Sequence, residues 1–300
     1  MSNYYKSVAV LFCLFLTLCF NNTYAQHTEL RARIAEFAKP AKGIVGVSVL
    51  GLEDRDTLNY NGSARLVMHS VFKLPIAMAV LHLVDSGVFT LDKTIKLRKK
   101  DMRPDTWSPL RDKFPDGGEF TLRDLLGYLV SQSDNAACDN ILKFLGGPEQ
   151  VEDYIHSIKV RGINIEVGED GMAKNWEAQY TNWAKPVDMV KLIDKLYTGK
   201  ALLPPSRDFL IKILTETTTG PNRIKAKLPP GTVVAHKTGT SPTNDAGLSP
   251  ATNDVGVITL PNGKHVAIAI FVCNSTADMA TRELVIANIA KAVYDEKVKK

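Results

Sequence analysis

The sequence predicts an α/β (α+β) fold, in which an antiparallel five-stranded sheet is flanked by the terminal helices and accompanied by an all-helical lobe. Two observations support this prediction. Alternating, β-branched segments typical of strands lie near both ends of the 300-residue chain, whereas residues 70–214 between them have a mostly helical pattern. Strands from the two ends pair most simply into one sheet, which leaves the helical block as a second lobe. A site between the lobes would take residues from both.

Five segments carry the strand pattern. The second closes at Asn61-Gly62, and the last two are joined by Pro261-Asn262-Gly263, whose Asn-Gly pair is a strong hairpin signal. We therefore expect strands at residues 44–50, 57–60, 232–237, 254–260 and 264–272.

Helical periodicity accounts for most of the remaining chain, with Gly and Pro residues separating the helices. We assign residues 26–66 and 217–300 to the sheet lobe and residues 67–216 to the helical lobe, with the active site at their interface. The expected helices are residues 28–39, 70–85, 121–130, 134–145, 149–158, 187–197, 206–216 and 279–294.

The first 25 residues are typical of a signal peptide. Lys6 gives a positive start, residues 8–20 are apolar but too few for a stable membrane anchor, and Ala25 is a small residue at a cleavage position. A lipoprotein signal ending at Cys19 is the weaker interpretation, because the bulky Leu18 precedes the cysteine. We expect export to a Gram-negative periplasm without stable membrane association.

The composition argues against several kinds of partner. With 37 basic and 32 acidic residues the net charge is +5 and the surface is mixed, without the basic stripe that nucleic acid requires. His-x-His and His-Glu-x-x-His spacings are absent, so we expect no metal and no cofactor. Cys138 and Cys273 lie in separate apolar stretches and are expected to be free and buried. We expect a monomer that acts on a small molecule.

The segment that organises this chain begins with Ser70 and Lys73, at the start of an apolar helix. Side chains three residues apart share one face of a helix and can touch. A hydroxyl beside an amine, at the positive end of a helix dipole, is a plausible activated nucleophile. Ser-x-x-Lys alone is weak support, since about one match per 300 residues arises by chance.

Three later segments supply possible partners for Ser70. Ser133-Asp134-Asn135 falls in a turn between two expected helices. Lys237-Thr238-Gly239-Thr240 lies at the end of an expected strand, where a glycine lets a ligand approach the backbone. Glu169 lies in a long non-periodic stretch, residues 167–183, and long loops in compact domains are usually functional.

Ser-x-x-Lys, Ser-Asp-Asn and Lys-Thr-Gly, in this order, resemble the motif set of class A serine β-lactamases. The resemblance covers essentially all of the chain after residue 25. Residues 131–139 and 179–183 are similar to the branch that includes the PER, VEB and Bacteroides-type cephalosporinases. The resemblance implies the fold shared by serine β-lactamases and penicillin-binding transpeptidases, and hydrolysis of β-lactam antibiotics, cephalosporins and penicillins among them, through a serine acyl-enzyme.

The resemblance also implies roles at the reacting bond. Ser70 would be the acylated nucleophile, with its own N–H and that of Thr240 forming the oxyanion hole. Lys73 would relay the proton, and Ser133 would pass a proton to the departing lactam nitrogen. The base of the acylation step stays open between Lys73 and Glu169 acting through a water.

Further roles concern binding and the release of the acyl group. Lys237, Thr238 and Thr240 would bind the substrate carboxylate, and Asn135 would hold its side-chain amide. Glu169 would activate the water that releases the acyl group. We prefer Glu169 to Glu166, because it lies thirteen residues before Asn182, the spacing that the family has between its glutamate and the Asp or Asn that ends the loop.

Four features depart from the commoner class A pattern. The family often has an Asn where this chain has Ala173, which leaves the hydrolytic water less firmly held. Asp139 and Asn182 look like an exchanged Asn–Asp pair, expected to complement each other and to pin the loop in a different shape.

The other two departures concern the carboxylate end of the site. Val255 occupies a position where many members of the family have an arginine, and Arg223 matches an alternative arginine of other members. Arg223 would either help to bind the substrate carboxylate or form a structural ion pair. Residues 241–252 look like a longer loop that goes with a roomier pocket and cephalosporin use.

Three aromatic or imidazole side chains near these motifs need an interpretation. Trp107 matches an aromatic residue at the mouth of the pocket in the family. His69 precedes Ser70, yet neighbouring helical side chains diverge, so we expect it to pack behind the site rather than act as a base. His236 is expected to be structural.

Other functions share parts of this motif set. A penicillin-binding D,D-peptidase would share the serine, the lysine and Lys-Thr-Gly, but Glu169 ahead of Asn182 argues against it. A glutaminase is less compatible with an exported chain carrying Ser-Asp-Asn. A non-catalytic β-lactam sensor would lack the deacylating base. The sequence does not rank the drug classes or predict inhibition by clavulanate.

Overall fold

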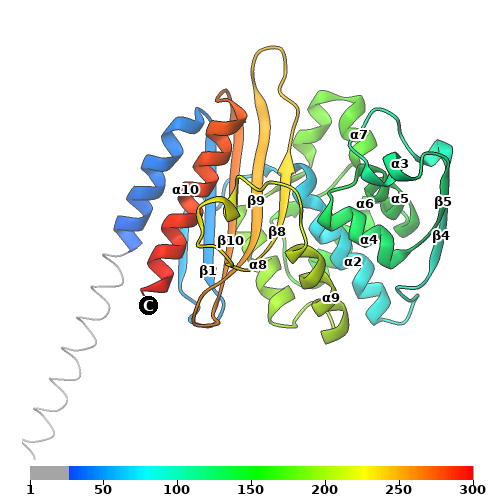
Figure 1. The fold of residues 1–300 in the computed structure, drawn as a ribbon, viewed down its shortest axis with the longest axis horizontal. Helices are drawn as coiled ribbons and strands as arrows, with labels where there is room; N and C mark the ends of the chain where they lie inside the picture. Colours follow the sequence, from blue (N-terminus) through cyan, green and yellow to red (C-terminus); the bar gives the residue numbers. More distant parts are fainter. Residues whose placement is uncertain (1–26, 300) are drawn as a thin grey trace, which may run out of the picture.

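The computed structural model describes residues 27–299, in which the expected five-stranded antiparallel sheet is present (Figure 1). Its strand order is β2-β1-β10-β9-β8, so the strands from the two ends of the chain do pair, through β1 and β10. The strands are β1 (Ile44–Gly51), β2 (Thr57–Tyr60), β8 (Val234–Thr240), β9 (Ser249–Thr259) and β10 (His265–Ser275).

The connection between β8 and β9 is shorter than expected. Thr240 pairs with Thr252, and the Ser241 N–H donates to the Ala251 carbonyl, so β9 begins at Ser249. The loop therefore comprises residues 241–248, and the prediction of a loop through residue 252 was wrong. Ser249 and Thr252, two of the polar residues that suggested a longer loop, are buried in β9, where Ser249 pairs with Ser275 of β10 and Thr252 pairs with both β8 and β10.

The two terminal helices cover one face of the sheet, lying side by side in Figure 1. They span residues 27–38 and α10 (Met279–Val298). Alternate residues of β10, such as Ile268 and Ile270, join Ile34 and Ile289 in the cluster under these helices, while Ala269 and its neighbours on the other face join the larger cluster. β10 is thus buried on both faces, which explains its nearly continuous apolar sequence.

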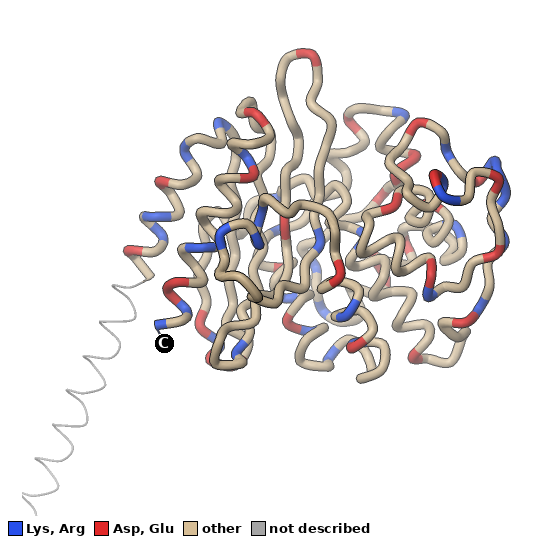
Figure 2. Tube along the Cα trace, in the orientation of Figure 1, with Lys and Arg blue, Asp and Glu red and all other residues tan. Residues whose placement is uncertain are grey.

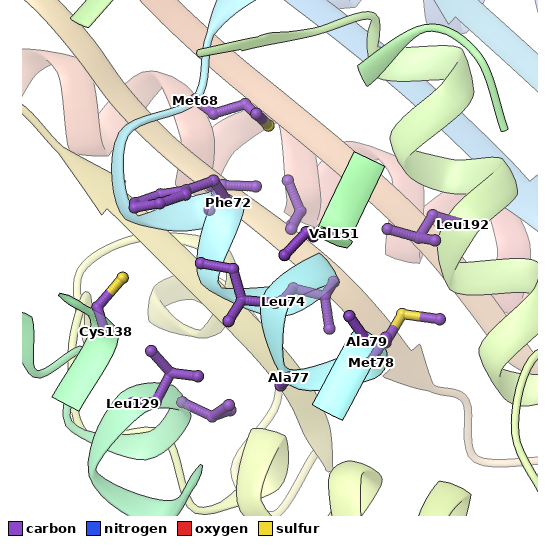
Figure 3. Packing of buried hydrophobic residues seen from close by; sticks show 14 of the residues in the cluster. Met68, Phe72, Leu74, Ala77, Met78, Ala79, Leu129, Cys138, Val151 and Leu192 are labelled. Atoms are coloured by element: carbon purple, nitrogen blue, oxygen red, sulfur yellow. The ribbon is translucent and has the colours of Figure 1, made fainter. Parts of the chain in front are cut away.

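The opposite face of the sheet carries α8 and the helical block. At the centre of that block lies α2, which is buried from Lys73 through Leu81, as expected of a helix that is apolar all round. Figure 3 shows Leu74 and Met78 of α2 among apolar side chains from neighbouring helices. The main helices are α2 (Lys73–Asp85), α4 (Leu122–Ser131), α5 (Asn135–Leu145), α6 (Pro148–Ser157), α8 (Pro186–Tyr197) and α9 (Pro204–Thr215).

Several short elements were not expected from the sequence, because they are too short to show a period. A small sheet joins β3 (Leu66–Val67), β7 (Trp183–Ala184) and β6 (Ile163–Asn164). It pairs the segment before Ser70 with the end of the 167–183 stretch. The others are the two-stranded sheet of β4 (Thr94–Arg98) and β5 (Gly117–Thr121), the helices α3 (Pro109–Lys113) and α7 (Glu169–Lys174), and the 3-10 turns η1 (Lys39–Ala41), η2 (His69–Phe72), η3 (Lys99–Asp101), η4 (Trp176–Thr181) and η5 (Ile224–Lys227).

Three further expectations have different outcomes: one cannot be compared with the structure, one stays a prediction and one is confirmed. The signal peptide, residues 1–25, lies outside the described residues. The lobe boundaries at residues 66 and 216 stay a prediction, although α8, placed in the helical lobe by sequence, packs on β1 and β10. Cys138 and Cys273 are both buried and unpaired.

Acidic and basic residues are interspersed along the trace (Figure 2).

Within residues 27–299, no helix combines the length and the apolar character needed to cross a membrane.

The central position of α2 predicts the cost of a cavity there. Val80 is fully buried on α2, whereas Val88, just beyond its end, is 63% exposed. Val80→Ala removes buried methyl groups and leaves a void, which is expected to lower the free energy of unfolding by about 2–3 kcal/mol. The same change at Val88 is expected to alter it by less than about 0.5 kcal/mol. Urea denaturation of both variants tests this difference, and equal losses would contradict it.

Candidate active site

Ser70 lies in the 3-10 turn η2, and α2 begins at Lys73. The regular helix therefore starts three residues later than expected, but Ser70 still sits at its N-terminal end. The Asn253 side chain of β9 donates to the Val67 and Met68 carbonyls at 2.8 and 3.0 Å, which holds the segment before the turn against the sheet.

The Lys73 ammonium is fully buried and surrounded by acceptors. Its Nζ lies 3.1 Å from Ser70 Oγ, 2.8 Å from the Ser133 carbonyl and 2.5 Å from Asn135 Oδ1. Glu169 Oε1 lies 2.9 Å away and completes a buried ion pair. Because burial of an unpaired charge is costly, these oxygen atoms keep the ammonium in place beside the Ser70 hydroxyl.

Glu169, the first residue of α7, is the carboxylate that the structure brings to Ser70, with Oε1 3.2 Å from Oγ. Burial acts to raise the pKa of Glu169, but the charge and the hydrogen bond of Lys73 act against it, and the pKa is lowered overall. The group is therefore an ionised base at neutral pH. Glu166 instead accepts a hydrogen bond from Asn164 Nδ2 at 3.1 Å.

The stretch around Glu169 is held by two side chains that act separately. Asp139 accepts the N–H groups of Glu169 and Asp170 at 2.8 and 3.1 Å, at the start of α7. Asn182 accepts those of Glu166 and Val167 at 2.9 and 3.2 Å.

The expectation that Asp139 and Asn182 complement each other was therefore wrong, because each binds different loop backbone. The 167–183 stretch is also less irregular than its sequence suggested, since it contains α7 and η4. The loop is pinned, as expected, but by two independent sets of hydrogen bonds.

Ser133 occupies the turn between α4 and α5 with a left-handed backbone, φ 57°. Its neighbour Asp134 is buried and caps α5 by accepting the Ala137 N–H at 2.8 Å, and also accepts the Leu110 N–H at 2.7 Å. Asp134 thus fixes the turn against α3, which directs the Ser133 hydroxyl to Lys237 Nζ, 2.8 Å away. Asn135 Nδ2 donates to Thr106 Oγ1 at 2.6 Å.

β8 supplies the side of the site that faces this turn. Lys237 is fully buried, and burial together with the Lys73 charge lowers its pKa well below the ordinary value. A Cβ on Gly239 would lie 2.3 Å from the Met68 carbonyl. Only glycine therefore allows β8 to approach the Ser70 turn this closely.

Arg223 lies behind β8 rather than in the cavity. Its guanidinium donates to Thr240 Oγ1 at 2.7 Å and to the Gly239 and Asn253 carbonyls, and pairs with Glu283 at 3.1 Å. This is the structural ion pair left open by the sequence, and direct contact with a substrate carboxylate stays a prediction. Its position is compatible with an action through Thr240.

These side chains surround one cavity of about 580 Å³. Trp107, 61% exposed, stands at its rim and is oriented by a hydrogen bond from Nε1 to the Gln132 carbonyl. Ala173, which replaces the common Asn, also lines it. The other lining residues are His69, Ser70, Thr106, Ser133, Asn135, Glu169, Met172, Trp176, Gln179, Thr219, Thr238, Thr240 and Pro242.

Some of these residues were missed or misplaced by sequence reasoning. His69 lines the cavity instead of packing behind the site, and it contacts Gln179. Thr219 was missed, although its hydroxyl lies 2.6 Å from Thr238 Oγ1. Neither contact follows from spacing, since each joins segments that meet only in the fold. His236 is buried and pairs with Asp254 at 2.8 Å, away from the cavity lining.

No group of three or more His, Cys, Asp or Glu residues within the described chain is arranged to hold a metal ion.

Comparisons with known proteins agree with this geometry. A model of the β-lactamase enzyme family matches residues 29–296. The chain is 41% identical to β-lactamase VEB-1 of Pseudomonas aeruginosa, over 97% of each chain. It is 39% identical to the extended-spectrum β-lactamase PER-1 of the same species, over 93% of this chain and 90% of that one. The crystal structure of a β-lactamase from Chitinophaga pinensis superposes with a TM-score of 0.88 at 47% identity, covering 90% of this chain and 99% of that one.

Asp139 makes stability depend on pH. Burial and the nearby Glu169 charge raise its pKa from 3.8 to about 7. The folded chain therefore keeps a proton that the unfolded chain loses between about pH 4 and 7, so the contribution of this group to the free energy of unfolding falls as pH rises through that window. Asp139→Asn cannot titrate and is expected to flatten this fall.

Urea unfolding of the parent and Asp139→Asn at about pH 5 and about pH 8, on either side of most of that window, measures the effect. Exposed Asp153→Asn serves as the matched control. Parallel pH dependence of the parent and Asp139→Asn would contradict the assignment.

Proposed function

Because the chain belongs to the class A serine β-lactamases and hydrolyses the β-lactam ring, we propose that Ser70 is its acylated nucleophile and Glu169 its deacylating base. The observation that carries this proposal is the position of two groups, Lys73 Nζ and Glu169 Oε1, within 3.2 Å of Ser70 Oγ. Both are buried, so their charges act on the Ser70 hydroxyl more strongly than they would in bulk water.

In the acylation step, Ser70 Oγ attacks the lactam carbonyl and its proton passes through a water to Glu169, or to Lys73 after the Lys73 ammonium has passed a proton to Glu169, 2.9 Å away. The negative charge that develops on the carbonyl oxygen is stabilised by the N–H groups of Ser70 and Thr240. Preorganised donors of this kind contribute about 10²–10³ each in rate. Ser70 at the end of α2 also benefits from the positive end of the helix dipole.

Ser133 carries the proton to the lactam nitrogen as the ring opens. Its hydroxyl is 2.8 Å from Lys237 Nζ, and the adjacent carbonyl is 2.8 Å from Lys73 Nζ, so one turn connects the two lysines. The substrate is an anion, and Lys237, Thr238 and Thr240 bind its carboxylate. Arg223 supports this end of the site through its hydrogen bond to Thr240 Oγ1. Asn135 holds the side-chain amide.

In the second step, Glu169 removes a proton from the water that attacks the acyl-enzyme. This base separates a hydrolase from a D,D-peptidase or a β-lactam sensor, which would retain the acyl group. Ala173 offers the water no side-chain hydrogen bond, so its position depends on Glu169 and Ser70. Asp139 supports Glu169 by holding its backbone N–H.

We propose cephalosporins and penicillins as substrates, and the cavity supports this proposal. Its volume of about 580 Å³ lies within the range of small-molecule sites. Trp107, Met172, Trp176 and Pro242 give it an apolar wall for a substrate side chain, while the polar groups cluster around Ser70. The relative PER-1 carries the name of an extended-spectrum enzyme, which supports a broad range. We also propose a periplasmic monomer, consistent with the signal-like first 25 residues.

The direct test is to mix the purified protein with nitrocefin, a chromogenic cephalosporin. Repeated turnover is expected, and Ser70→Ala should abolish both turnover and covalent labelling. One equivalent of labelling without turnover would instead favour a peptidase or a sensor, and the absence of any reaction would contradict the proposal. Kinetics on one penicillin, one cephalosporin and one carbapenem then rank the drug classes.

The loop carboxylates provide a sharper test. Glu169→Gln removes the base and is expected to lower the deacylation rate about 10²–10⁴-fold, with accumulation of an acyl-enzyme detectable by mass spectrometry. Glu166→Gln changes the same chemical group three residues earlier, where the side chain contacts Asn164, and is expected to turn over at the parental rate within a few-fold. If Glu169→Gln turned over normally, the assignment of the base would be wrong.

A further inference from the structure

His69, the residue before Ser70, is in contact with the loop that carries Glu169. Its imidazole is only 7% exposed, lines the cavity, and has Nε2 2.7 Å from Gln179 Oε1. Gln179 is 3% exposed and belongs to η4, the second half of that loop. One hydrogen bond thus joins the turn bearing the nucleophile to the loop bearing the base.

The direction of this hydrogen bond follows from its surroundings. Gln179 Nε2 donates to the Trp176 carbonyl at 2.7 Å, so the amide oxygen is the atom that faces His69. An oxygen accepts, and therefore His69 Nε2 carries the proton. Burial lowers the pKa of His69, which keeps the ring neutral near pH 7 and leaves Nδ1 unprotonated. The His69 Nε2–H therefore donates to Gln179 Oε1 in the loop.

The other anchors of the loop engage its start or its end: β3 pairs with β7, and the Met68 N–H donates to the Asn182 carbonyl at 3.0 Å, both just after η4. Asp139 and Asn182 hold the backbone around residues 166–170. In η4, Tyr180 donates to Asn274 Oδ1 at 3.1 Å, on the β10 side. The His69–Gln179 hydrogen bond ties η4 to the turn that carries Ser70. Its geometry therefore bears on the position of Glu169 relative to Ser70, whose hydroxyl donates to Glu169 Oε1 at 3.2 Å.

We propose that His69 and Gln179 form a positioning pair, which holds the Glu169 loop at the distance from Ser70 that deacylation requires. The proposal rests on the function proposed above for Glu169. In this proposal neither His69 nor Gln179 touches the bonds that form or break in the reaction. Loss of the pair slows hydrolysis of the acyl-enzyme more than its formation, because Ser70, Lys73 and the β8 donors keep their own contacts.

A double-mutant cycle tests the pair. His69→Phe keeps a ring but removes the N–H, and Gln179→Met keeps the length but removes the acceptor. Each is expected to lower the deacylation rate about tenfold, the effect typical of losing one buried hydrogen bond, with acylation changed less than about threefold. The double variant is expected to be no slower than either single one, because both remove the same interaction.

Matched controls and a conservative variant separate positioning from general damage. His156→Phe and Gln150→Met make the same changes on α6, whose residues 150 and 156 lie outside the cavity lining, and are expected to leave both steps unchanged. Gln179→Glu keeps an acceptor for His69 and is expected to recover part of the deacylation rate. If His69→Phe does not fold, Gln179→Met and Gln179→Glu still carry the comparison.

Pre-steady-state kinetics with nitrocefin separate the two steps. Independent losses that multiply in the double variant, or no loss of the deacylation rate in either single variant, would each overturn the positioning role. The proposed function fails in a different way, if the parent protein itself forms no acyl-enzyme or if Glu169→Gln deacylates normally.

Discussion

The buried ion pair between Lys73 and Glu169 is the interaction on which the rest of the site depends. Its two charges lie 2.9 Å apart, and each is also within hydrogen-bond distance of the Ser70 hydroxyl, in a position almost closed to solvent. Removal of one partner from such a pair is strongly destabilising, because the other charge is left without compensation. Replacement of a buried ion pair by well-packed apolar residues often leaves a protein equally or more stable. We infer that the pair is kept for its chemistry.

The surrounding structure can be understood as the means of holding that pair. Lys73 needs acceptors from the Ser133 turn, which Asp134 fixes by capping α5. Glu169 needs a loop held near the Ser70 turn, which Asp139 and the pairing of β3 with β7 provide. The sheet closes the site from the other side. These contacts join segments that lie from 30 residues apart, for Asp139 and Glu169, to 116 residues apart, for Val67 and Trp183 (183 − 67), so the pair forms only once the tertiary structure is assembled.

The sequence predicted long elements well and short ones poorly. Strands such as β10 and helices such as α2 have enough residues to show a period, and the three motifs fall at their ends. β3, β6, β7 and α7 are too short to show one, and they are specified by tertiary pairing. The polar start of β9 has a composition typical of a loop, and it is a strand because it pairs with β10, which its own residues do not reveal.

The sequence by itself determined the fold class and the family. It also singled out Ser70, Lys73, Ser133, Lys237 and Glu169, because their motifs are recognised from residue type and order along the chain. Only the tertiary structure decided which atoms meet. It separated Asp139 from Asn182, turned Arg223 toward Glu283, and brought His69 to Gln179. The physical reason is that a hydrogen bond forms only when donor and acceptor are placed to within a few tenths of an ångström. These groups are far apart in the chain, and no spacing along one segment contains that information.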